Sequence, residues 1–192
     1  MKFTSVTILL IFVFLQLSSS SFAQRMSPEE KLAFNIKRLD MDPFLPMYEA
    51  MILEYTTMAD IAVPALVDVI REEEDEKTVR SAIYILGRLG PASEKAVIPI
   101  TRALTNKESS ADIKSTALGA LGRIGEKSSP SIPAIAQYLY DEDLWLSEQA
   151  ERALKSINNS AAKAALKEFY VKKNSAKAPV DGKKDKEKSE NE

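Results

Sequence analysis

A phrase of apolar, small and basic residues occurs three times in the middle of this chain, and it constrains the fold more than any other feature. The copies begin at Val79, Ile113 and Leu146, and a shorter phrase with a proline precedes each copy. These prolines are Pro64, Pro99 and Pro133, which follow one another at intervals of 35 and 34 residues. A repeat of this length is typical of stacked two-helix units.

The apolar residues within each copy recur at helical spacing. In the middle copy they lie at offsets 0, 4, 8 and 11, which places them on one face of a helix. They are Ile113, Ala117, Leu121 and Ile124, and the third copy has Leu146, Ala150, Leu154 and Ile157. The small alanine in each set allows neighbouring helices to approach closely. The pattern therefore predicts an all-α fold without strands.

The predicted helix ends carry residues that suit them. Gly90 and Gly125 follow the last apolar residue of their copies, and Asn158 stands in that place in the third. We expect each to adopt the left-handed conformation that ends a helix. The three repeated prolines should lie in the first turn of the preceding helices, where the missing N–H costs least.

The segments outside the repeats predict further units. Residues 1–23 resemble a signal peptide, with Lys2 before an apolar run and small residues at a cleavage site after Ala23. Residues 24–58 should form a helical cap, with one helix from Ser27-Pro28 to about Leu39 and another from Asp42. Repeats then occupy 59–158, a capping helix 159–170 and a disordered charged tail 171–192. An uncleaved membrane anchor over residues 3–23 is the alternative for the N-terminus.

Composition narrows the classes of function. The chain has neither cysteine nor histidine, so thiolate nucleophiles, disulfides and the usual zinc ligands are absent. Its formal net charge of −2 provides no general attraction for nucleic acid or anionic lipid. We expect a non-catalytic monomer without cofactor or metal, which binds neither nucleic acid nor, once the signal is cleaved, a membrane.

The repeats resemble HEAT repeats of the class also found in phycobilisome lyases. The resemblance rests on Val63-Pro64-Ala65-Leu66, on Val79-Arg80 and on Leu86-Gly87-Arg88-Leu89-Gly90, and it covers about residues 59–158. Ser147 and Lys155 depart from the pattern in the third copy. The resemblance implies an α-solenoid, a superhelical stack of helix pairs whose second helices line an inner surface that binds protein segments.

Candidate binding residues follow from the repeat register. Positions two and six residues beyond each core alanine should face outward, and their large or basic members are Tyr84, Arg88, Arg123 and Arg152. They predict a strip that binds an acidic protein partner, with Tyr84 as an anchor. Trp145 is a second aromatic candidate for the interface, although we favour a partly buried role for it in closing the last repeat.

Other charged groups have simpler interpretations. Arg80 and Lys114 should pair with acids in the preceding loops, such as Asp75 and Glu108, and so brace successive repeats. Residues 72–76 and 141–143 are acidic and should lie along one edge of the stack, where helix capping explains them better than calcium binding. Asn158-Asn159-Ser160 matches a glycosylation acceptor in a eukaryotic host.

These features favour an exported scaffold or adaptor of the cell envelope, periplasmic or secreted, that binds a protein on its inner helical surface. Two alternatives stay open. The first is a lyase-like protein that handles a chromophore or another cofactor. The second is a membrane-tethered assembly factor, which would retain the N-terminal segment.

Overall fold

The computed structural model of the chain describes residues 26–36, 39, 52–72 and 75–177. Within these residues all regular structure is helical and no strand occurs, which confirms the expected all-α class. The predicted signal peptide, the start of the helix expected from Asp42 and the last residues of the tail lie outside the described part. None of the described helices combines the length and apolar character needed to cross a membrane.

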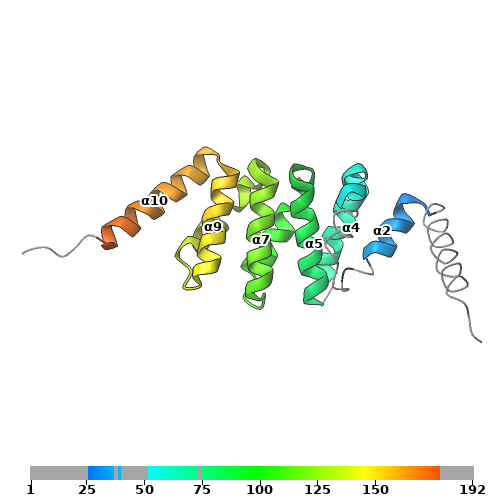
Figure 1. The fold of residues 1–192 in the computed structure, drawn as a ribbon, viewed down its shortest axis with the longest axis horizontal. Helices are drawn as coiled ribbons and strands as arrows, with labels where there is room; N and C mark the ends of the chain where they lie inside the picture. Colours follow the sequence, from blue (N-terminus) through cyan, green and yellow to red (C-terminus); the bar gives the residue numbers. More distant parts are fainter. Residues whose placement is uncertain (1–25, 37–38, 40–51, 73–74, 178–192) are drawn as a thin grey trace, which may run out of the picture.

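The helices alternate between two rows. Three α-helices carry the proline phrase, namely α4 (Ala59–Glu72), α6 (Val97–Thr105) and α8 (Ile132–Gln137), and we call them the first-helix row. Three others carry the repeated phrase, namely α5 (Glu76–Leu89), α7 (Ala111–Ile124) and α9 (Leu144–Ile157), and we call them the second-helix row. Helix α5 packs on α7 and α7 packs on α9, as Figure 1 shows.

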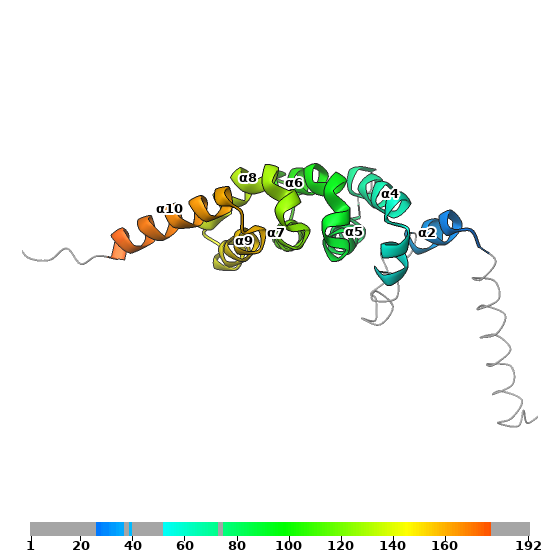
Figure 2. The ribbon, with the colours of Figure 1, turned by 90° about the horizontal axis from the view of Figure 1, so that it is seen from above.

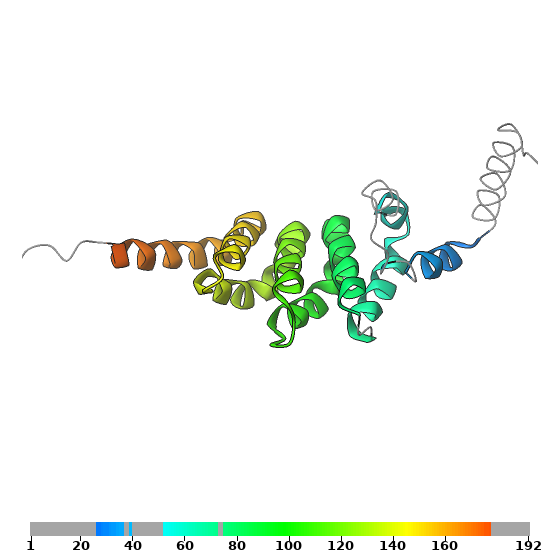
Figure 3. The ribbon, with the colours of Figure 1, turned by 60° about the horizontal axis from the view of Figure 1, so that its bottom comes forward.

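The two rows occupy opposite sides of the molecule. The view from above separates α4, α6 and α8 on one side from α5, α7 and α9 on the other (Figure 2). Helices α2 (Pro28–Ile36) and α10 (Ser160–Lys177) lie at opposite ends of this array. In Figure 3 the three helices of the second-helix row run side by side, so their solvent-exposed faces form one continuous side of the molecule.

The core lies between the rows and is built from the aligned repeat positions. Six repeated small or leucine side chains of the second-helix row are completely buried: Ala82, Leu86, Ala117, Leu121, Ala150 and Leu154. The first-helix row contributes Leu66, Ile100 and Ile135, which are also completely buried. The apolar periodicity of the sequence therefore predicted the core face correctly.

The glycine turns differ in detail from the prediction. Gly90 has φ 61° and ψ −135°, and Gly125 has φ 73° and ψ −138°, so neither adopts the left-handed helical conformation that we expected. Asn158 does adopt it, with φ 54° and ψ 17°. The difference arises because both glycines lead directly into short 3-10 helices, η1 (Gly90–Ala96) and η2 (Gly125–Ser131). Their conformation is accessible almost only to glycine.

The repeated prolines do not all occupy the same place. Pro99 and Pro133 lie in the first turn of α6 and α8, as predicted, but Pro64 lies inside α4 and that prediction is wrong. Helix α4 starts earlier because the Met58 carbonyl accepts the N–H of Ala62 at 2.9 Å. In the later repeats η1 and η2 occupy the corresponding stretch, so the α-helix begins closer to the proline.

The terminal helices also differ from their predicted lengths. Ser27 caps α2 as expected, because its hydroxyl accepts the Glu30 N–H at 3.1 Å while the Glu30 carboxylate accepts the Ser27 N–H at 2.8 Å. The described part of helix α2 reaches Ile36, and Leu39, near which the helix was predicted to end, lies in a turn. Helix α10 passes the predicted end at Tyr170 and reaches Lys177, so the first residues assigned to the tail are helical. A Glu168–Lys172 ion pair supports this extension at helical spacing.

Candidate interaction surface

The five candidate residues lie on the exposed side of the second-helix row, which we call the second-helix face. Aligning the core alanines makes Arg152 the equivalent of Tyr84, and Arg123 the equivalent of Arg88. Tyr84 and Arg88 are partly buried, whereas Arg123, Trp145 and Arg152 are exposed. Helical spacing places all of them opposite the buried alanines and leucines, so α5, α7 and α9 present them on one side.

Tyr84 lies between two arginines from neighbouring helices. The Arg88 side chain, one turn further along α5, donates from Nη1 to the Tyr84 hydroxyl at 3.0 Å, and its Cζ lies 5.9 Å from the ring centroid. The Cζ of Arg123 on α7 lies 5.7 Å from the same centroid. Both distances fall in the range of cation–π contacts. Two guanidinium groups therefore converge on one aromatic ring.

A glycine leaves space for the Arg123 side chain on α7. Arg123 Nη1 is only 3.5 Å from the position that a β-carbon of Gly119 would occupy. Gly119 is the equivalent of Tyr84 in the middle repeat. Because this position carries no side chain, the guanidinium can lie along α7 and reach toward the tyrosine of the preceding repeat.

Trp145 belongs to the exposed surface and not to the core, so our favoured interpretation of this residue is wrong. Its side chain is 55% exposed, and that of the neighbouring Leu144 is 78% exposed. Asp143 caps α9 by accepting the Trp145 N–H at 2.9 Å, which places the tryptophan in the first turn. Leu146, one position later, faces inward and is buried instead.

Arg152 links Trp145 to the second-helix face. Its Cζ lies 5.9 Å from the Trp145 ring, and its Nη2 lies 3.6 Å from a carboxylate oxygen of Glu148. Trp145, Glu148 and Arg152 follow one another at helical spacing along α9. The structure thus groups the five predicted residues into two clusters, Tyr84–Arg88–Arg123 on α5 and α7 and Trp145–Arg152 on α9.

Arg80, which we expected to pair with an acid such as Asp75, has a different partner. Arg80 Nη1 lies 3.0 Å from the Asp112 carboxylate in the first turn of α7, so the pair joins successive helices of the row. The expectation of an acid in the preceding loop was wrong because Arg80 points toward the next repeat. Lys114 makes no salt bridge with any residue that the structure describes.

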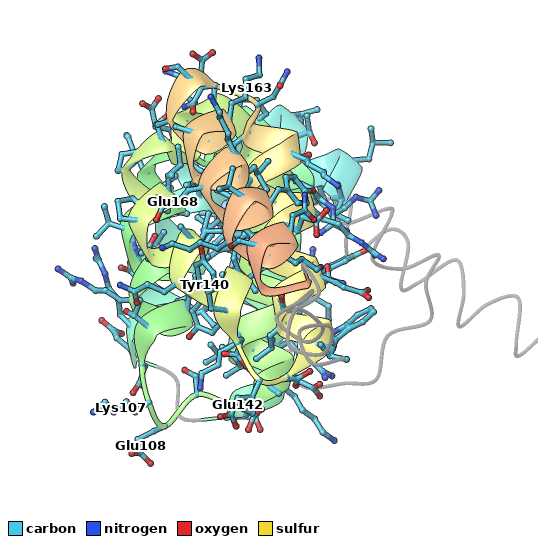
Figure 4. All side chains as sticks on the ribbon, turned by 90° about the vertical axis from the view of Figure 1, so that its left-hand side faces the viewer. Lys107, Glu108, Tyr140, Glu142, Lys163 and Glu168 are labelled. Carbon is cyan, nitrogen blue, oxygen red and sulfur yellow. The ribbon has the colours of Figure 1, made fainter. Side chains whose placement is uncertain are left out.

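The two acidic segments singled out in the sequence each provide a helix cap. Figure 4 shows Lys107, Glu108 and Glu142, from two successive loops, at the same edge of the molecule. Asp75 caps α5, and the hydrogen bonds from the Thr78 hydroxyl and N–H lower the pKa of its carboxyl. Asp143 caps α9. Among the described residues no group of acidic side chains is arranged to hold a metal ion.

Sequence reasoning missed the polar contacts that join one repeat to the next on the first-helix row. The Tyr138 hydroxyl donates to the Leu104 carbonyl at 2.6 Å, and the Thr101 and Ser131 hydroxyls lie 2.6 Å apart. Burial raises the pKa of Tyr138, with Asp141 as a smaller cause. The only signal in the sequence was a separation of about one repeat, which many other residue pairs share.

A second missed feature is the aromatic cluster beneath α10. Tyr140 and Phe169 pack edge to face with centroids 5.4 Å apart, and Lys172 Nζ lies 5.4 Å from the Tyr140 ring. The Tyr170 hydroxyl donates to Glu151 of α9 at 2.6 Å. These contacts attach α10 to the last repeat.

Comparison with known proteins adds no functional assignment: no family model matches the chain, and a search of the curated proteins finds no match.

Proposed function

We propose that this chain is an exported, non-catalytic adaptor whose helix pairs form a HEAT-like α-solenoid, and that it binds a protein partner on the second-helix face. The observation that carries the proposal is the pair of aromatic and arginine clusters on that face, in which Arg123, Trp145 and Arg152 are exposed. Tyr84 lies between Arg88 and Arg123, and Trp145 lies under Arg152. Tryptophan, tyrosine and arginine are the residues most enriched at binding hot spots.

The two sides of each helix in the second-helix row carry different kinds of residue, and this difference supports a binding role. The alanines and leucines that recur in every copy of the second helices are buried, and they account for the packing of one unit on the next. The residue two positions after the core alanine differs between the copies. It is Tyr84 in the first copy, Gly119 in the second and Arg152 in the third. Tyr84 is partly buried and packs against the core, whereas Arg152 is exposed. Variation at a repeated position on this side of the helices is what we expect of a surface that recognises a partner.

The alternation of helices in two rows supports the solenoid assignment. Such an array exposes one extended side built from equivalent helices, which suits the binding of a protein segment better than a small-molecule pocket does. Export rests on the signal-like residues 1–23, with cleavage after Ala23, and places the adaptor in the periplasm or outside the cell. A retained N-terminal segment would make it a membrane-tethered assembly factor.

The proposal is tested by crosslinking and capture from the native cell envelope. The test variant combines Arg123→Glu with Trp145→Ala, and the matched control is Arg102→Glu, an exposed arginine on the first-helix row. We expect the test variant to lose the captured partner and the control to retain it, with unchanged helical circular dichroism in both. Equal capture by the wild type and both variants would remove the second-helix face as the binding site.

A further inference from the structure

We infer that the second-helix face binds an extended segment of its partner in one fixed polarity, with a carboxylate at the Tyr84 cluster and an apolar side chain at Trp145. This inference rests on the proposed function and specifies its partner. The occupant is an acidic, single protein segment that crosses α5, α7 and α9.

The carboxylate is assigned to Arg123, at the edge of the Tyr84 cluster, because no described residue offsets the positive charge of this side chain. Within the part of the chain that the structure describes, the Arg123 guanidinium makes no salt bridge and no hydrogen bond. It is exposed, its Cζ lies 5.7 Å from the Tyr84 ring centroid, and its Nη1 lies 3.5 Å from the position that a β-carbon of Gly119 would occupy. A guanidinium presents five donors in a planar fork that matches a carboxylate.

The Trp145 end has the opposite character. The charge of Arg152 is offset by Glu148 at 3.6 Å, and Asp143 precedes the exposed Leu144 and Trp145 directly. A carboxylate placed here would meet negative charge and would be disfavoured. An apolar side chain would instead cover two exposed apolar residues. Charge complementarity therefore fixes which end of the bound segment is acidic.

The spacing of the helices gives the length that a partner segment needs to reach both clusters. Helices α5 and α9 lie two steps apart in their row, and each step is about 8–10 Å. On α9 the equivalent of Tyr84 is Arg152, and Trp145 lies seven positions before it. This adds an offset of about 10 Å along the helix axis. The two clusters are thus roughly 20 Å apart, which an extended chain at about 3.3 Å per residue spans in roughly six residues.

The test uses Trp145 as the reporter, because it is the only tryptophan in the chain. The probes are synthetic glycine–serine peptides that carry two glutamates and one leucine roughly six residues apart, in both chain directions. Matched probes replace the glutamates by glutamines or halve the spacing. We expect the glutamate probe of one direction to shift Trp145 emission to the blue and protect it from acrylamide quenching, with about tenfold or more tighter binding than the glutamine probe.

The variants separate the inference from the proposed function. Arg123→Gln should abolish the preference for glutamate over glutamine, while Arg102→Gln should leave it unchanged. The inference is overturned if the full chain responds to no probe at millimolar concentration, if glutamine and glutamate probes bind equally, if spacing is irrelevant, or if a short oligonucleotide binds as tightly as the glutamate probe. If envelope capture still depends on Arg123 and Trp145 in any of these cases, the proposed function stands without it.

Discussion

At the scale of single residues, glycine and alanine determine how closely the second helices approach. A β-carbon on Gly87 would lie 2.7 Å from the Cα and 2.8 Å from the Cβ of Ala120, and one on Gly122 would lie 3.0 Å from the Cα of Ala153. Each glycine therefore faces an alanine of the next repeat. The third copy has Lys155 at this position, where it is exposed because no further helix of the row follows α9.

This pairing predicts opposite effects for two glycine substitutions. Gly87→Ala should lower the free energy of unfolding by about 1–3 kcal/mol, because the new methyl group overlaps the backbone of Ala120. Gly119→Ala meets only the end of the flexible Arg123 side chain at 3.5 Å, so the gain in helix propensity should raise stability by up to about 1 kcal/mol. Urea unfolding followed by circular dichroism measures both. Equal effects would contradict this account of the interface between α5 and α7.

At the scale of elements, the polar contacts between α10 and α9 centre on one carboxylate, that of Glu151. Glu151 accepts a hydrogen bond from the Tyr170 hydroxyl at 2.6 Å and pairs with Lys155 on its own helix. The hydrogen bonds from Lys155 and Tyr170 lower the pKa of Glu151 below its ordinary value of 4.5. A single ionised group thus joins the capping helix to the last repeat.

The attachment of α10 should weaken in acid. Because the pKa of Glu151 is lower in the folded protein than in the unfolded chain, its contribution is complete above the ordinary value and is lost as the pH falls through the lowered one. Between about pH 5 and about pH 3, the wild type should lose more stability than Glu151→Gln. The measurement is the urea midpoint as a function of pH. Parallel curves for the two proteins would show that Glu151 does not hold α10.

At the scale of the whole molecule, the array needs a cover at its C-terminal end. Helix α10 buries Ala162, Leu166 and Phe169 against the last repeat. Beyond these residues it is exposed, as at Val171, which is 60% exposed. The first part of α10 therefore completes the core, and its last turns do not.

Two truncations test the role of this cover. Deleting residues 159–192 should cost roughly 3 kcal/mol or more, since it removes the burial of Leu166 and Phe169, and should increase the binding of a hydrophobic dye. Deleting only residues 174–192 removes none of the side chains that are buried in the described part of the chain, and it should have little effect. Thermal unfolding and dye fluorescence distinguish the two. A stable protein without residues 159–192 would show that the last repeat needs no cap.

Features that depend on local geometry were predicted correctly, and features that depend on contacts between repeats were not. Repeat spacing and apolar periodicity identified the helices and the buried alanines and leucines, because both depend on local geometry along the chain. The partner of Arg80 and the exposure of Trp145 were predicted wrongly. The partner of Arg80 depends on which acid the next repeat brings near it, and the sequence alone did not favour Asp112 over Asp75. The exposure of Trp145 depends on which of the neighbouring residues 145 and 146 turns toward the core.

The sequence by itself determined the all-α class, the repeat register and the core face, since helical periodicity and a fixed repeat length follow directly from the order of residues. Only the tertiary structure decided that Arg88 and Arg123 converge on Tyr84 and that Trp145 is exposed on the same side. Residues 84 and 123 are far apart along the chain. Their contact requires α5 and α7 to pack closely, and Gly87 against Ala120 makes that packing possible.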